Sequence, residues 1–188
     1  LSIVEEYDPR TDTWTKKKNA PISGGTGSAC SLNGKIYVMG GSPTTGNYEY
    51  DPANDKWTKK ADMPTGRWGL RTVALNDKIY AIGGMTAPGV STPVVEEYDP
   101  SLDKWTKKAD MINSKAWHIA NAINGKIYVV GGGKVWGTPI STAEVYDPET
   151  DTWTQLPDAP IARAIMSSSV ADGKIYIMGG INLGHQTI

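Results

Sequence analysis

Basic side chains recur at one position of a repeat that runs through this chain of 188 residues. Arg67 and Arg163 each stand three residues after a proline, and Lys115 occupies the equivalent position in another copy. The fourth copy has Gly24 there. Cations gathered in this way suit a carboxylate, which arginine can bind through two parallel hydrogen bonds. Arg67, Lys115 and Arg163 are therefore candidate binding residues for an acidic partner.

Two further polar groups lie near these cations in the pattern. Arg71 stands deeper along one predicted strand, and His118 follows soon after the lysine. A second interpretation of the cations stays open, in which they pair with acidic groups of adjacent copies such as Glu96 or Glu144. Under the first interpretation, replacing both arginines of the repeat position with alanine abolishes binding of acidic ligands.

Aromatic residues outside the repeat form a second candidate group. The chain has 7 Trp, 9 Tyr and no Phe. Twelve of these recur in every copy, and the remaining four are Trp68, Trp117, Trp136 and Tyr48. Exposed Trp and Tyr are typical anchors of interfaces, and Trp136 lies in a Gly-rich loop where we expect exposure. For Trp68 and Trp117 the alternative is that they fill a central channel.

Residues for metal binding or nucleophilic catalysis are scarce. The two histidines, His118 and His185, are far apart in the repeat, and the single Cys30 reads as a small buried group. We find no paired ligands for a metal and no phosphate-cradling glycine loop. The sequence therefore predicts no metal and no other cofactor, and no residue is assigned a catalytic role.

Composition narrows the classes of partner. The formal net charge is −1, which favours neither nucleic acid nor an anionic membrane surface. No apolar run is long enough to span a bilayer. Residues 1–188 fit a single domain, and Leu1 in place of Met is consistent with a piece of a longer protein.

The elements that position these residues come from four tandem copies of one unit. Each copy contains Lys-Ile-Tyr, a glycine pair, Tyr-Asp-Pro and a tryptophan, with spacings of 43, 48 and 48 residues between copies. The repeated structural residues are Gly40, Gly41, Gly83, Gly84, Gly131, Gly132, Gly179, Gly180, Trp14, Trp57, Trp105 and Trp153.

One copy predicts four short antiparallel strands. In the second copy these run over Gly69–Leu75 and Lys78–Ile82, then to Tyr98, and from Trp105 onward. The second strand of each unit is apolar on both faces, which requires a sheet packed on both sides. Radially arranged blades of a β-propeller meet this requirement. The fold class is therefore all-β.

Glycine pair, Tyr-Asp-Pro and tryptophan at this period resemble the kelch repeat, and the resemblance covers essentially the whole chain. It implies a kelch-type β-propeller in which the repeated Tyr, Trp and Gly residues pack between blades. It also implies that the Pro-x-x-Arg position can supply basic groups that hold acidic partner segments. Some members are enzymes, including galactose oxidase and sialic acid mutarotases.

The chain starts with the last two strands of one unit and ends with the first two of another. We expect the two halves to complete a fourth blade between the termini and so to close a ring of four blade-equivalents. The alternative is an open arc cut from a larger ring. Such an arc would expose apolar faces and unpaired edges and would favour a homodimer.

These patterns predict a non-enzymatic binding scaffold. The loops between the second and third strands of each unit, and the linkers between units, share one face of the propeller. Variable loops on a rigid scaffold are the usual place for binding, so we expect a protein or an acidic peptide to bind there. Two alternatives stay open. One is a mutarotase-type enzyme using Arg67, Arg71, Arg163 and His118, and the other is an assembly module that self-associates through blade edges.

Overall fold

The computed structural model describes residues 2–22, 26–41, 44–134 and 138–182, and the regular elements of these residues are β-strands. The strands are β1 (Val4–Asp8), β2 (Thr13–Lys17), β3 (Ser28–Leu32), β4 (Lys35–Met39), β5 (Asn47–Asp51), β6 (Lys56–Lys59), β7 (Arg71–Leu75), β8 (Lys78–Ile82), β9 (Met85–Ala87), β10 (Val90–Ser91), β11 (Val95–Asp99), β12 (Lys104–Lys108), β13 (Ile119–Ile123), β14 (Lys126–Val130), β15 (Ala143–Asp147), β16 (Thr152–Leu156), β17 (Ser167–Ala171) and β18 (Lys174–Met178).

Twelve of these strands build three four-stranded antiparallel sheets, which confirms the predicted blades. The first blade has the order β3-β4-β5-β6, the second β7-β8-β11-β12 and the third β13-β14-β15-β16. The two-residue turns between the first two strands place Asn33, Asn124 and Asp172 at positive φ, as tight hairpins require. Strand boundaries in the second blade agree with the predicted ones within about two residues.

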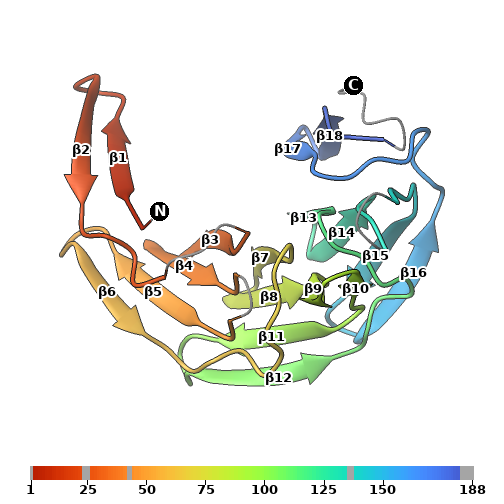
Figure 1. Cartoon of the computed structure of the whole chain (residues 1–188), viewed down its shortest axis with the longest axis horizontal. Helices are drawn as coiled ribbons and strands as arrows, with labels where there is room; N and C mark the ends of the chain where they lie inside the picture. The colour runs from red at the N-terminus through yellow and green to blue at the C-terminus, as the bar shows by residue number, and fades with distance from the viewer. Residues whose placement is uncertain (1, 23–25, 42–43, 135–137, 183–188) are drawn as a thin grey trace.

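The blades follow one another around an open arc (Figure 1). Strands β3, β7, β13 and β17 lie on the inner side, where neighbours contact each other, and β6, β12 and β16 lie outside. Strands β1 and β2 form an N-terminal half-blade at one end, and β17 and β18 form a C-terminal half-blade at the other.

The predicted joining of the half-blades does not occur in this structure. The pairs β1-β2 and β17-β18 are separate two-stranded sheets, and Figure 1 shows them at opposite ends of the arc with a gap between them. The physical reason is geometric. The packing between consecutive blades fixes their relative rotation, and three complete blades at this rotation do not bring the ends together.

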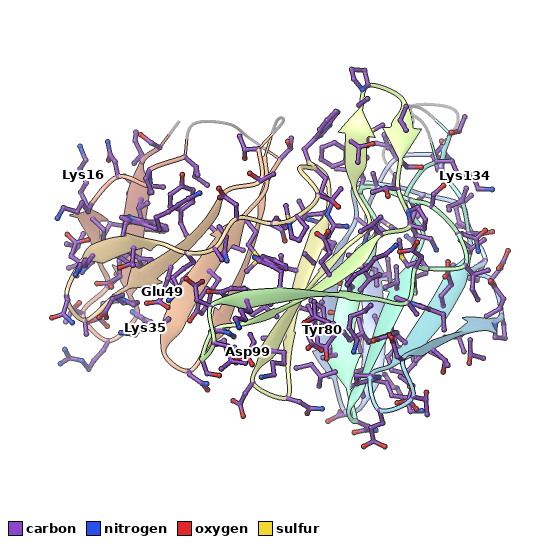
Figure 2. All side chains as sticks on the ribbon, turned by 90° about the horizontal axis from the view of Figure 1, so that it is seen from below. Lys16, Lys35, Glu49, Tyr80, Asp99 and Lys134 are labelled. Carbon is purple, nitrogen blue, oxygen red and sulfur yellow. The ribbon has the colours of Figure 1, made fainter. Side chains whose placement is uncertain are left out.

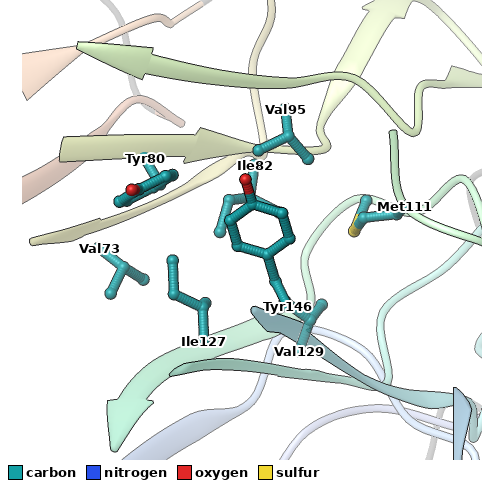
Figure 3. Packing of buried hydrophobic residues seen from close by; sticks show 8 residues of the cluster. All are labelled: Val73, Tyr80, Ile82, Val95, Met111, Ile127, Val129 and Tyr146. Carbon is teal, nitrogen blue, oxygen red and sulfur yellow. The ribbon is translucent and has the colours of Figure 1, made fainter. Parts of the chain in front are cut away.

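The core lies between blades rather than within one sheet. Ile79, Tyr80, Ala81 and Ile82 of β8 are all at most 2% exposed, so both faces of this strand are covered, as its apolar pattern predicted. Figure 3 shows the largest cluster, where the second blade packs on β14 and β15 of the third. There the ring centroids of Tyr80 and Tyr146 are 5.8 Å apart and tilted by 60°, a favourable aromatic geometry.

A hydrogen-bonded clamp joins each blade to the one before it. In the second blade, the Tyr98 hydroxyl donates to Asp103 at 2.6 Å, and the same carboxylate accepts the N–H of Ala61 at 2.8 Å. The Trp105 indole donates to the carbonyl of Ala61 at 2.9 Å. The first and third blades repeat the clamp with Tyr50, Asp55 and Trp57 on Lys18, and with Tyr146, Asp151 and Trp153 on Ala109.

The glycine pair of the second blade is required by close approach of backbone atoms. Gly83 has φ +57°, and a Cβ there would lie 2.5 Å from the carbonyl oxygen of Lys115. The N–H of Gly84 donates to that same carbonyl at 2.9 Å. A side chain at Gly83 would therefore clash with the next blade, and one at Gly84 would clash with its own blade, where a Cβ would lie 2.8 Å from the carbonyl oxygen of Trp68.

Opposite faces of the arc carry different kinds of connection. In Figure 2, Lys35 and Asp99, beside the tight turns, point to the lower side, and Lys134, in a longer loop, lies on the upper side. A hairpin that the sequence analysis missed, β9–β10, also projects upward. Its turn contains Pro88 and Gly89, with φ +74° at the glycine, a common turn pair.

Candidate functional site

Arg67 is a structural cation in this fold. Its side chain is fully buried, and its guanidinium forms a 2.8 Å ion pair with Glu96 of the same blade. It also donates to the carbonyls of Gly83, Val94 and Ala81. These partners accept hydrogen bonds from several sides of the guanidinium. The structure therefore supports the second interpretation, in which the cation pairs with an acidic group inside the protein.

Lys115 repeats this arrangement in the third blade. Its ammonium lies 2.8 Å from Glu144, and both side chains are fully buried. The hydroxyl of Thr142 accepts another hydrogen bond at 2.8 Å. Burial lowers the pKa of Lys115, and the opposing effect of Glu144 is smaller. Lys115 is therefore inaccessible to an external ligand here.

The first blade lacks both members of the buried pair. Gly24 stands at the cation position, outside the described residues, and Tyr48 stands at the strand position that holds an acid in the other blades. Tyr48 is part of β5, and its ring centroid is 4.9 Å from the Lys59 ammonium. Tyr48 thus lies within the sheet.

Arg163 differs from the other cations because its half-blade has no third strand. Its guanidinium donates to the carbonyl of Gly179 at 3.3 Å, as Arg67 does to Gly83. Among the described residues it forms no ion pair. Arg163 is partly exposed, so it remains a candidate binding residue.

His118 is fully buried behind the inner rim. Neither ring nitrogen has a hydrogen-bond partner among the described residues. Burial is the main cause that lowers its pKa well below the usual value, and the nearby charges of Lys115, Arg71 and Arg67 add to it. The imidazole is therefore neutral and enclosed, and it does not face the surface as the mutarotase-type alternative requires.

A belt of backbone hydrogen bonds follows the inner rim. The N–H of Gly69 donates to Thr26, that of Trp117 to Gly69 and that of Ile165 to Trp117, at 2.8–3.0 Å. All four residues have positive φ, which is uncommon for Trp, Thr and Ile. We call these four residues the belt.

The candidate tryptophans lie along this rim. Trp117 is partly buried over Gly69, where a Cβ would lie within 3.1 Å of its ring. Trp68 is also partly buried, and its backbone pairs with Met85 beside the β9–β10 hairpin. Both residues belong to linkers between units, which are expected to share the binding face. The predicted Trp136 lies outside the described residues.

Arg71 opens onto a hollow between the inner strands. The hollow has a volume of about 330 Å³, and its polar lining comes from Arg71 of β7, Asn121 of β13 and the hydroxyls of Ser167 and Ser168 of β17. Arg71 Nε donates to the carbonyl of His118 at 2.8 Å, which fixes the guanidinium. Among the described residues Arg71 forms no ion pair.

Three lining residues of this hollow were missed by sequence reasoning. Asn121 interrupts an otherwise apolar strand, and Ser167 and Ser168 stand where the third blade has Ile119 and Ala120. Asn121 also donates to Ser168 at 2.8 Å, which links the two strands. Comparing the inner strands of the four copies for polar residues would have identified these positions.

No cluster of three His, Cys, Asp or Glu side chains is placed to hold a metal ion in the part of the chain that the structure describes. In the same residues, no helix has the length and apolar character needed to cross a membrane.

Four-stranded sheets joined by tryptophan clamps and glycine pairs define blades of a kelch-type β-propeller. The chain matches the KLHDC2/KLHL20/DRC7 Kelch-repeats domain over residues 28–187, and it belongs to that family. A solved structure titled "Structure of YjhT" superposes with a TM-score of 0.87 at 20% identity, covering 98% of this chain and 70% of that one. The comparison with curated proteins gives no match.

Proposed function

We propose that this chain is a non-enzymatic binding scaffold that holds an acidic segment of a partner protein at the inner rim. The observation that carries the proposal is Arg71, a fixed guanidinium beside a polar hollow. Arginine remains protonated at neutral pH and can bind a carboxylate through two hydrogen bonds. The cation that supports binding is thus Arg71, in place of the buried Arg67 and Lys115.

The volume and the polar lining of the hollow favour an amino-acid side chain over a bulky ligand. A volume of about 330 Å³ is at the lower end of the range for small-molecule sites. One Glu or Asp side chain fits such a space, with Asn121, Ser167 and Ser168 as further hydrogen-bond partners. The partly buried Trp68 and Trp117, on the same rim, supply aromatic contact area for flanking residues.

The test measures binding of a short glutamate-rich peptide with blocked termini, followed by intrinsic tryptophan fluorescence. A peptide with glutamine in place of glutamate is the neutral control. We expect Arg71→Gln to weaken binding of the acidic peptide at least about tenfold, because a hydrogen bond to a charged group contributes about 1.5–3 kcal/mol. Lys104→Gln removes one exposed charge from the outer strand β12 and is the matched control.

Binding of the acidic peptide should also weaken as salt is added. Equal affinities of the two variants for the acidic peptide would contradict the proposal, as would equal affinity of the wild type for the glutamate and glutamine peptides. Thermal unfolding of both variants establishes that the fold is intact.

A further inference from the structure

The groups that line the hollow beside Arg71 are rich in hydrogen-bond donors. Arg71 uses its Nε on the carbonyl of His118, which leaves the N–H groups of its terminal nitrogens for a ligand. Among the described residues, no Asp or Glu lines the hollow. A ligand that accepts hydrogen bonds therefore matches this lining better than one that donates them.

Asn121 and Ser168 connect two donors across neighbouring strands. Nδ2 of Asn121 in β13 donates to the hydroxyl oxygen of Ser168 in β17 at 2.8 Å. A serine hydroxyl that accepts this bond keeps its own proton to donate elsewhere. Both residues line the hollow, so the hydroxyl proton of Ser168 is available to a ligand there.

The position of Asn121 is apolar in the second blade. Asn121 is the third residue of β13, and the third residue of β7 is Val73. Val73 is 7% exposed and belongs to the largest core cluster. A partly buried amide costs more free energy than an aliphatic side chain unless its hydrogen bonds are made. A departure of this kind from the pattern that packing favours is typical of a functional position.

We propose that Asn121 orients the Ser168 hydroxyl as a donor, so that the hollow selects a carboxylate over a carboxamide of the same shape; this selectivity rests on the proposed binding of an acidic segment. A carboxylate presents only acceptor oxygens, which match the guanidinium of Arg71 and the hydroxyl of Ser168. A carboxamide turns its NH₂ group toward one of these donors, which leaves that donor without an acceptor. Asn121 is thus a positioning residue that acts through Ser168.

Removing the hydroxyl of Ser168 tests the donor. The quantity measured is the ratio of the dissociation constants of the glutamine and glutamate peptides, followed by tryptophan fluorescence. We expect Ser168→Ala to weaken binding of the glutamate peptide at least about fivefold and that of the glutamine peptide less than about twofold. Ser169→Ala, at the next residue of β17, is the control because Ser169 does not line the hollow. A wild-type ratio in Ser168→Ala would overturn the proposal.

Asn121→Val separates positioning from support of the fold, because it introduces the residue of the second blade. We expect an unfolding temperature at least equal to that of the wild type, together with a ratio that falls to the value of Ser168→Ala. Adding Ser168→Ala to Asn121→Val should lower the ratio no further, because the two residues act as one unit. An unchanged ratio in Asn121→Val, or losses that add in the double variant, would contradict the positioning role.

Ser28 and Thr72 provide a matched control for a hydrogen bond between inner strands. Their hydroxyl oxygens are 2.9 Å apart and buried, and they join β3 to β7 as Asn121 joins β13 to β17. Ser28 does not line the hollow. We expect Ser28→Ala to lower the unfolding temperature and to leave the ratio unchanged. A fall in the ratio as large as that of Asn121→Val would attribute selectivity to loosened strands and would overturn the proposal.

The hydrogen bond between Asn121 and Ser168 can be measured without a ligand. Side-chain amide protons give separate resonances in a nitrogen–proton correlation spectrum, and a donated proton exchanges slowly with deuterated water. We expect Ser168→Ala to shift the Asn121 side-chain resonances and to speed their exchange, whereas Ser169→Ala does neither. Identical resonances and exchange in the wild type and Ser168→Ala would show that the bond does not form in solution, which would overturn the proposal.

The outcomes distinguish this selectivity from the proposed function on which it rests. If Arg71→Gln and Lys104→Gln bind the glutamate peptide equally, both fail. If Arg71→Gln weakens binding while Ser168→Ala and Asn121→Val keep the wild-type ratio, the proposed function stands and the selective role of Asn121 and Ser168 fails.

Discussion

Arg67 and Arg71 are four residues apart, carry the same charged group and have different roles in this fold. Arg67 turns into the blade, where Glu96 neutralises it. Arg71 turns toward the hollow and keeps only a backbone acceptor among the described residues. Breaking the buried pair by removing one partner would cost about 3–5 kcal/mol. A loss of binding in an Arg67 variant would therefore report a damaged fold, which makes Arg71 the informative position.

His118 should make the stability of the protein depend on pH in mildly acidic solution. Its folded-state pKa is lowered well below the usual value, whereas the unfolded chain takes up a proton near pH 6.5. Below that pH the unfolded state binds more protons, so the free energy of unfolding falls as the pH falls. The slope contributed by one histidine is at most about 1.4 kcal/mol per pH unit.

Urea unfolding at pH 7.5, 6.5 and 5.5 measures this effect. We expect His118→Leu to have a smaller decrease in unfolding free energy between pH 6.5 and 5.5 than the wild type. Parallel pH dependences would show that His118 does not titrate as the burial implies. Asp99, whose pKa Lys78 helps to lower to about 2, loses its contribution at lower pH and does not interfere in this window.

At the scale of elements, the belt imposes a backbone conformation that its residues do not prefer. Ile165 has φ +56°, and a left-handed conformation costs a β-branched residue about 1–2 kcal/mol. Asparagine tolerates this region better. We expect Ile165→Asn to raise the free energy of unfolding by about 0.5–1 kcal/mol, since the side chain is 49% exposed and loses little packing.

Chemical denaturation of Ile165→Asn and Ile161→Asn provides the comparison. Ile161 is similarly exposed, at 44%, and its φ is not positive, so the control should be neutral or slightly destabilised. If both variants gain stability, the gain comes from placing a polar side chain on the surface. That result would contradict the role of backbone strain.

Most of the elements could be predicted from the sequence, because each is specified locally. Lys78–Ile82 has an apolar pattern on both faces, and Asn124-Gly125 is a hairpin signal. The β9–β10 hairpin was missed because its strands are two or three residues long, too short for a periodic pattern. The hollow beside Arg71 was missed because it depends on how three inner strands approach one another, which no single copy of the repeat encodes.

At the scale of the whole molecule, equivalent tryptophans should contribute unequally to stability. Trp105 donates its indole to Ala61 and packs between blades, whereas Trp14 at the end of the arc is 70% exposed. We expect Trp105→Ala to lower the free energy of unfolding by about 3 kcal/mol and Trp14→Ala by at most about 0.5 kcal/mol.

Both variants are compared with the unchanged chain, in which Trp14 is exposed. Thermal unfolding followed by circular dichroism is the measurement. A similar loss of stability in both variants would show that Trp14 is already covered within a single chain. That result would contradict the open arc.

Overall closure was the feature that sequence reasoning could not supply. The number of blade-equivalents follows from counting repeats, but the rotation from one blade to the next depends on packing between Tyr80, Tyr146 and their neighbours. The structure places the half-blades at opposite ends of the arc, because three complete blades at the rotation set by their packing do not bring the ends together.

The belt has a consequence for redesign of this protein. Its hydrogen bonds use only main-chain atoms of Thr26, Gly69, Trp117 and Ile165, so the side chains at three of these positions can be exchanged without removing these hydrogen bonds. Gly69 is the exception, because a Cβ there would lie 2.9 Å from the Trp117 ring. Ligand preference at the rim can therefore be varied separately from the support beneath it, which makes the belt the natural starting point for a library of engineered binders.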